Sequence, residues 1–240
     1  MEKIFAEAGL DRSLPHIGVI MEKRDTFDYP RYSLPNGFEF SLFRQGFERQ
    51  WAELQLEAGL ADTLEDAESV FRHEFLYGKS IDWTNRDKEA VLPENTEECP
   101  CFNEMCRRMV FVVDGSGNLA GTGALWKGDI FGTERQRLHW IAVKPEHQGK
   151  GIAKAIVARL LDTYNRLGYS KYVYLTSQTW SYKALGIYMN FGFTPYMGEK
   201  PEKWKSVNLT SGNFEPWDYR EKNTEAWCII REKLEQYKNK

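Results

Sequence analysis

A glycine-rich turn between a strand and a helix constrains the fold of this chain more than any other feature. Residues 138–143 (LHWIAV) predict a strand that is apolar almost throughout and is therefore expected to be buried on both faces. The turn Gln148-Gly149-Lys150-Gly151 follows, and apolar residues then recur at helical spacing until Gly168 ends the helix. Glycines let backbone amides approach a ligand, and a helix N-terminus carries a partial positive charge. The segment therefore predicts either a phosphate cradle or a tight strand-to-helix turn.

Two common phosphate loops fit this turn badly. The sequence Gly149-Lys150-Gly151 is not followed by the Ser or Thr that a nucleoside triphosphatase loop uses for magnesium. The full G-x-G-x-x-G pattern of a dinucleotide site is also missing here. If the turn binds phosphate, Lys150 supplies a cation beside it and Gln148 a side-chain amide.

The rest of the chain mixes strands and helices in an α+β pattern. Residues 38–44 alternate like a strand, and helices are expected at 47–58 and from Thr63. Runs at 109–113 and 119–126 around a Gly-rich turn predict an antiparallel hairpin. Further along the chain, the pattern predicts a strand at 172–177, a short helix capped by Ser181, and a last strand near 227–231. A turn cluster at 32–37 separates an N-terminal extension, residues 1–35, from a single domain, residues 36–240.

Composition excludes several classes of protein. The 240 residues carry 32 Lys+Arg against 35 Asp+Glu, a net charge of −3, which argues against nucleic acid as a partner. Charges interrupt the apolar residues at the N-terminus, and no run approaches the length of a membrane span. We therefore expect a cytoplasmic protein with no membrane partner. Aromatic residues reach 14%, which hints at a lined pocket.

Three of the four cysteines, Cys99, Cys101 and Cys106, are close together in the sequence. They suggest a metal site completed by His147 or Cys228. However, the spacing C-x-C-x4-C is not a common zinc pattern, so we expect free thiols and no metal.

Two motifs together resemble the GCN5-related N-acetyltransferase (GNAT) family. The first is Gln148-Gly149-Lys150-Gly151-Ile152-Ala153, which is similar to the family's Q/R-x-x-G-x-G/A acyl-CoA motif, with Ala153 in the last Gly position. The second matches the family's later helix at Ser181, Ala184, Ile187, Tyr188, Gly192 and Phe193. The resemblance is close over residues 108–196 and extends weakly back to Phe38.

The resemblance implies the GNAT fold, a mixed and mostly antiparallel sheet of about seven strands flanked by helices, with central strands that splay apart to bind acyl-CoA. It places the pyrophosphate of acetyl-CoA on the amides of Gln148, Gly149, Lys150, Gly151, Ile152 and Ala153. It places the pantetheine along the backbone of Ile141, Ala142 and Val143, like an added strand. Ser181 is carried over as a further cofactor-binding residue.

The implied reaction is direct transfer of an acetyl group from acetyl-CoA to an amine. Tyr188 matches the family tyrosine near the sulfur and is the candidate general acid; the alternative is a core tyrosine. Relatives often carry a Glu on the strand before the turn, and residues 137–141 have no carboxylate. His139 is therefore the candidate base, unless it is a core residue or water relays the proton.

The acceptor site is expected among helices 47–75. Carboxylates there and in the following irregular stretch either attract a cationic amine or simply face water: Asp62, Glu65, Asp66, Glu68, Glu94, Glu97, Glu98 and Glu104. Trp126, Trp140 and Trp180 either stack on the acceptor or belong to the core. The loop at 199–225, with Trp204 and Trp217, is long enough for a lid or a homodimer contact.

Three functions remain open on sequence grounds. The leading prediction is an N-acetyltransferase that acts on the amine of a small molecule. The alternatives are an acetyltransferase for protein N-termini or lysines, and a catalytically silent acyl-CoA-binding module.

Overall fold

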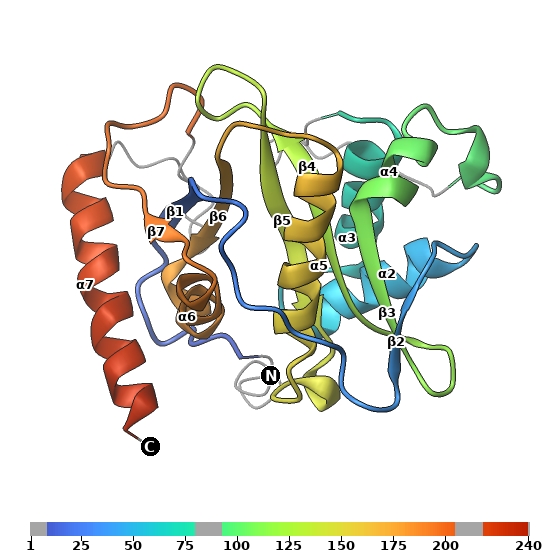
Figure 1. Ribbon diagram of the computed structural model, residues 1–240, viewed down its shortest axis with the longest axis horizontal. Coiled ribbons are helices and arrows are strands. Elements are labelled where there is room, and N and C mark those ends of the chain that lie inside the picture. Colours follow the sequence, from blue (N-terminus) through green and yellow to red (C-terminus); the bar gives the residue numbers. More distant parts are fainter. Residues whose placement is uncertain (1–8, 80–92, 205–217, 240) are drawn as a thin grey trace. The chain divides into compact units, whose positions relative to one another are not determined.

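The computed structural model describes residues 9–79, 93–204 and 218–239, and its strands form one seven-stranded sheet in the order β2-β3-β4-β5-β6-β1-β7 (Figure 1). The strands are β1 (Gly18–Lys23), β2 (Phe38–Ser41), β3 (Met109–Asp114), β4 (Leu119–Gly128), β5 (Arg135–Val143), β6 (Val173–Gln178) and β7 (Thr194–Pro195). β5 pairs with β6 in parallel, while β2–β3, β3–β4, β6–β1 and β1–β7 are antiparallel. The predicted α+β class and mixed, mostly antiparallel sheet are confirmed.

The helices agree with the sequence patterns in most places. They are α2 (Phe47–Glu57), α3 (Leu64–Val70), α4 (Phe102–Arg108), α5 (Ile152–Arg166), α6 (Tyr182–Asn190) and α7 (Tyr219–Lys238). Thr63 caps α3 as expected, because its Oγ1 accepts a hydrogen bond from the Asp66 amide at 3.0 Å. Gly168, with φ 74°, follows the end of α5 in the left-handed conformation that glycine allows.

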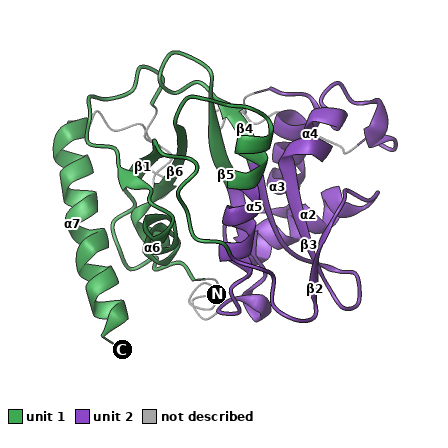
Figure 2. Cartoon of the chain, viewed as in Figure 1, with its two compact units in different colours: residues 1–31, 125–139, 161–240 green, residues 32–124, 140–160 purple. Residues whose placement is uncertain are grey.

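The chain divides into two compact units (Figure 2). Unit 1 contains residues 1–31, 125–139 and 161–240, and unit 2 contains residues 32–124 and 140–160. β4, β5 and α5 each contribute residues to both units. The predicted division into an extension, 1–35, and a domain, 36–240, stays a prediction, although residues 18–23 supply strand β1, which the sequence analysis did not foresee.

In unit 2, helices pack on both faces of the β3–β4 hairpin. Phe111 of β3 contacts Phe47 of α2, with ring centroids 5.3 Å apart. Successive side chains on a strand point to opposite faces, so Gly121 and Gly123 of β4 face away from their neighbour Thr122. Both glycines lie against Ile156 of α5, which shows that glycine lets this helix approach the sheet closely.

We expect Gly123→Ala to destabilise the protein by about 1–3 kcal/mol, the usual cost of overpacking a core. An added Cβ would lie 2.8 Å from Ile156 Cγ2 and 3.0 Å from Ile141 Cγ1. Equilibrium urea unfolding measures the change. Gly115→Ala is the matched control, because the nearest atom to its Cβ is 4.0 Å away. Equal midpoints for the two variants would contradict this account of β4.

In unit 1, α6 and α7 pack closely against each other. An added Cβ at Gly186 of α6 would lie 2.7 Å from Leu234 Cδ2 of α7. Asn223 of α7 donates a hydrogen bond to the Tyr196 carbonyl at 2.9 Å, which ties this helix to the segment after β7.

The prediction of a last strand at 227–231 is wrong, because these residues belong to α7. Trp227-Cys228-Ile229-Ile230 has local strand propensity. However, Asp218 caps the helix by accepting from the amides of Arg220 and Glu221. Residues 223, 226, 227 and 230 are buried at helical spacing, so packing on one face overrides local propensity.

The prediction that residues 138–143 are buried on both faces is also wrong. Leu138, Ala142 and Val143 are buried, whereas His139, Trp140 and Ile141 are half-buried. An apolar run therefore identified a strand whose middle is partly open to solvent.

The irregular stretch after residue 76 contains the short 3-10 helix Thr96–Glu98 and α4, neither of which was predicted. Before it, residues Phe71–Leu76 form a π-helix, here η1, that continues α3. Part of the predicted lid or dimer loop, residues 205–217 with Trp217, lies outside the described residues.

Candidate functional site

The glycine-rich turn of unit 2 is open at Gly149 and Gly151. Gly149 and Gly151 have φ angles of 75° and 91°, and an added Cβ at either would have no atom within 4 Å. L-residues with a side chain rarely adopt such angles, so both positions require glycine for conformation rather than for space. α5 begins directly after Gly151, at Ile152. The orphan amides of its first turn and the positive end of its dipole therefore lie at the turn, which is the geometry of an anion cradle.

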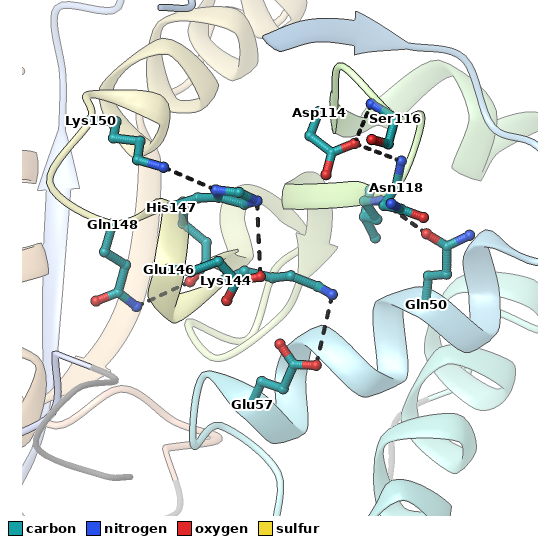
Figure 3. A network of polar contacts seen from close by, with 12 residues as sticks. Gln50, Glu57, Asp114, Ser116, Asn118, Lys144, Glu146, His147, Gln148 and Lys150 are labelled. Carbon is teal, nitrogen blue, oxygen red and sulfur yellow. Dashed lines mark hydrogen bonds and ion pairs between the residues drawn. The ribbon is translucent and has the colours of Figure 1, made fainter. Parts of the chain in front are cut away.

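Gln148 joins the turn to the strand before it. Its Nε2 donates a hydrogen bond to the Val143 carbonyl, at the end of β5, at 3.0 Å (Figure 3). The bond fixes where the turn starts relative to β5. A direct contact between Gln148 and a phosphate stays a prediction.

Lys150 supplies a cation at the turn, held by two aromatic rings. Its Nζ lies 3.2 Å from His147 Nδ1 and 5.6 Å from the centre of the Phe38 ring. Figure 3 shows this contact beside an ion pair between Lys144 Nζ and Glu57 Oε1, which are 3.7 Å apart.

The middle of β5 carries an unusual backbone conformation. Trp140 has φ 48°, a left-handed value that is uncommon for a residue with a side chain and costs roughly 1–3 kcal/mol. Its indole Nε1 donates to Glu74 Oε2 at 3.0 Å, and its ring lies 5.5 Å from that of Trp51. These contacts hold the strained residue in place. β5 thus bends at the point where the predicted pantetheine strand, Ile141 to Val143, begins.

Sequence reasoning missed Glu74, which lies beside β5 in unit 2 although it is remote in the chain. It comes from η1, and π-helical turns often occur at functional sites. A π-helix shifts the helical periodicity, so spacing alone could not show that residue 74 faces β5. A carboxylate is therefore present beside this strand, although β5 itself has none.

The predicted residues Tyr188, Ser181 and His139 belong to unit 1. Tyr188 of α6 is buried beside Phe193, with ring centroids 6.1 Å apart, and burial raises the pKa of its phenol far above the ordinary value. α6 begins after Ser181, as predicted, but the expected side-chain cap does not form. Instead, the Ser181 hydroxyl accepts a hydrogen bond from Gln178 Nε2 at 3.0 Å.

Several residues that sequence analysis assigned to an acceptor site have structural partners. Glu68 pairs with Arg49, and Glu104 pairs with Arg108 at 3.1 Å, which offsets their charges. Trp126 is buried in the core, and Trp180 donates to the Leu14 carbonyl at 2.7 Å. Trp140 is half-buried, and its indole is likewise bonded to Glu74.

Among residues 9–79, 93–204 and 218–239, no group of three or more His, Cys, Asp or Glu side chains could hold a metal ion. Of the suggested cysteine ligands, Cys99 is buried, Cys101 and Cys106 are half-buried, and Cys228 is exposed. Within the same described ranges, no helix combines the length and the apolar character needed to cross a membrane.

Comparison with known proteins identifies the segment that contains the turn. Residues 77–193 match the acetyltransferase (GNAT) family. This segment belongs to the GNAT family. It includes both motifs on which the sequence resemblance rested, and one of them is the glycine-rich turn of unit 2.

One curated relative is human N-acetyltransferase 8B, which is 31% identical over 113 residues, 46% of this chain. The chain matches 49% of that relative, about half its length. Solved structures with a similar fold include a GCN5-related N-acetyltransferase from Sphaerobacter thermophilus (TM-score 0.48, 17% identity, 81% of this chain and 52% of that one). Another is spermidine N-acetyltransferase from Vibrio cholerae in complex with CoA and spermine (TM-score 0.38, 21% identity, 67% of this chain and 82% of that one).

Proposed function

We propose that this protein transfers an acetyl group from acetyl-CoA to the amine of a small molecule. The observation that carries the proposal is the open turn at Gly149 and Gly151 at the start of α5, inside the residues that match the GNAT family. The amides of Gln148, Gly149, Lys150, Gly151, Ile152 and Ala153 would hold the pyrophosphate, because they lie at the positive end of a helix. The Gln148 amide would first have to leave the Pro145 carbonyl, to which it donates at 3.2 Å. The backbone of Ile141, Ala142 and Val143 would bond the pantetheine amides.

In the proposed reaction, the nitrogen lone pair of the amine attacks the thioester carbon. A C–N bond forms, the C–S bond breaks, and CoA leaves with the electron pair on sulfur. The amine proton passes to a base and the sulfur gains a proton, so the products are an amide and CoA thiol.

We assign Tyr188 to the leaving sulfur. An ordinary thiol has a pKa near 8.5, and the pKa of the buried Tyr188 phenol lies far above that value. Complete proton transfer from this phenol to the thiolate would therefore be uphill. The phenol stays protonated and stabilises the developing charge by donating a hydrogen bond, which is the part of general-acid catalysis that it can perform throughout the neutral range.

Two residues are candidates for the base. His139 of β5 is half-buried and is an imidazole, the side chain best suited to proton transfer near neutral pH. Glu74 presents a carboxylate to Trp140, one residue further along β5. Substitution of either residue is expected to lower kcat strongly only if that residue is the base.

We expect Glu74→Gln to lower kcat by about 100-fold if Glu74 is the base, since general bases contribute about 100- to 10,000-fold. The amide oxygen of glutamine can still accept from Trp140 Nε1, so the strand should keep its conformation. His139→Gln is the parallel variant, and steady-state acetylation across pH measures both. A full rate in Glu74→Gln with a large loss in His139→Gln assigns the base to His139, and full rates in both favour a water relay.

Release of CoA thiol from acetyl-CoA, measured against a panel of amines and peptides, tests the proposal as a whole. Turnover with small amines is the expected result. Turnover with peptides alone would support the alternative, an acetyltransferase for protein N-termini or lysines. Binding of acetyl-CoA without turnover on any acceptor would support the silent binding module. A cytoplasmic location and a homodimer, both expected from the sequence, remain predictions.

A further inference from the structure

The N-terminal half of β5, in unit 1, brings two arginines and two tyrosines to one face. Alternate residues of a strand share a face, so Arg135 and Arg137 point to the same side, as does His139 before the bend. β5 and β6 run in parallel with Arg137 beside Tyr174. Tyr172, two residues earlier, lies beside Arg135, whose guanidinium carbon is 4.3 Å from the centre of its ring.

Arg135 lies against two aromatic rings, and no ion pair to it is found among the residues that the structure describes. Its guanidinium carbon is 4.3 Å from the centre of the Tyr172 ring and 4.4 Å from the centre of the Phe131 ring, and these two rings are inclined to each other at 82°. One terminal nitrogen, Nη1, is buried and makes no hydrogen bond. The rings stabilise the charge but offer no acceptor in the plane of the N–H groups. A buried N–H of a cation without an acceptor is costly, so its surroundings favour an anion.

Tyr174 offers a second donor without an acceptor. The residue is fully buried, and burial raises the pKa of its phenol; the Ile130 backbone amide faces the hydroxyl oxygen, but the hydroxyl proton has no acceptor. The hydroxyl lies against Gly128 of β4: an added Cβ there would be 2.1 Å from it and 3.0 Å from Arg137 Cδ. Glycine at position 128 therefore allows the Tyr174 hydroxyl and the Arg137 side chain to meet.

The nearby acid Asp129 does not supply the missing acceptor to Arg135. Its carboxylate bonds to Lys203 Nζ at 2.5 Å, and this bond is the main reason that its pKa is lowered. Asp129 is thus paired mainly with Lys203, and its charge also acts on Arg137 and Tyr174, which leaves Arg135 as the guanidinium without an acid beside it.

We propose that Arg135, Arg137 and Tyr174 bind an oxyanion group, a carboxylate or a phosphate, carried by the acetyl acceptor. A guanidinium is planar and can donate two parallel hydrogen bonds to either group, and the tyrosine hydroxyl adds a third donor. The oxyanion site itself does not depend on the proposed function. The claim that its ligand is the acetyl acceptor does rest on that function. On this view the acceptor is an amine with an acidic group elsewhere in the molecule, rather than a polycation.

Direct binding tests the site independently of catalysis. The probes are inorganic phosphate and acetate, measured by isothermal titration at low ionic strength. The protein is the full chain carrying Gly151→Glu, so that the probes do not bind at the glycine-rich turn of unit 2. We expect saturable binding of at least one probe and an affinity at least 10-fold lower after Arg135→Gln. Arg159→Gln is the matched control, because the exposed Arg159 also stacks on a ring, 5.3 Å from the centre of Phe40. Equal binding with and without Arg135, or no saturable binding, overturns the proposal.

Tyr174→Phe separates binding from folding. The hydroxyl proton has no acceptor, so the melting temperature should stay close to that of the wild type, while probe affinity falls several-fold. Unchanged affinity in a folded Tyr174→Phe protein overturns the site as described.

Acetylation assays then distinguish the two anions. Amines with a carboxylate, a phosphate or a neutral group at matched chain length should differ in KM, with one anionic series at least 10-fold lower than the neutral series. Arg135→Gln should remove that difference and leave the KM for acetyl-CoA unchanged. If the probes bind but no amine is acetylated, the proposed function is rejected and the oxyanion site stands. If the three series of amines have equal KM values, the acetyl acceptor is not the ligand of this site.

Discussion

Gly151→Glu is expected to lower the affinity for acetyl-CoA by at least about 100-fold, or about 2.7 kcal/mol. Three effects act in the same direction. The residue has φ 91°, which an L-residue adopts at a cost of about 1–2 kcal/mol, so the turn would shift. The new side chain would enter the open space beside the turn, where an added Cβ has no atom within 4 Å and where the phosphates are expected. Its carboxylate would also repel the pyrophosphate and compete for the positive end of α5. Isothermal titration with acetyl-CoA measures the loss.

Gly168→Glu separates the binding effect from backbone strain. Gly168 lies at the other end of α5, has φ 74°, and also has no atom within 4 Å of an added Cβ. The strain and the added charge are therefore matched, but the substitution is at a helix C-terminus, away from the orphan amides. We expect a somewhat larger loss of stability in Gly168→Glu, because its charge lies at the negative end of α5, and normal acetyl-CoA binding in that variant. If both variants bind acetyl-CoA as tightly as the wild type, the cradle is not where the cofactor binds.

The sequence predicted the strand, the glycine turn and the start of the helix because their requirements are local. Two glycines, the end of a strand and the start of an apolar helical stripe are adjacent in the chain, and each has a physical reason to be there. Gly149 and Gly151 adopt positive φ angles, which glycine allows without strain, and their role as a phosphate cradle stays a prediction. The same locality explains the correct prediction of the Thr63 cap and of the hairpin formed by β3 and β4.

Features that depend on contacts between distant residues could not be read in the same way. Glu74 reaches Trp140 across 66 positions of the chain, and the π-helix that carries it breaks the periodicity that prediction relies on. α7 looked like a strand because Trp227 and Ile230 favour strands locally, whereas burial of one helix face decides its structure. The cluster at Arg135 depends on the parallel register of β5 and β6, which no local pattern sets.

Tyr188→Phe is expected to lower kcat by about 100-fold with little change in acetyl-CoA affinity, since losing one donor to a developing negative charge costs about 100- to 1,000-fold. The substitution removes one oxygen from a buried ring and leaves its packing against Phe193 intact. Pre-steady-state thiol release and acetyl-CoA titration measure the two quantities separately. Tyr182→Phe is the matched control, because both tyrosines lie on α6 with 9% exposure. A full rate in Tyr188→Phe would make Tyr188 a core residue.

The pH dependence provides a second test of the same residue. Burial raises the pKa of Tyr188 in the folded protein above that of an unfolded tyrosine, which is near 10. The protonated phenol is therefore favoured by folding, so its contribution to stability is complete below about pH 10 and is lost as the pH rises further. Ionisation of Tyr188 should not reduce kcat between pH 7 and about 10, and the wild type should lose melting temperature above that range more steeply than Tyr188→Phe. If kcat instead falls near pH 8 in the wild type and not in Tyr188→Phe, the phenol ionises there, and it cannot be the buried donor that stabilises the leaving thiolate.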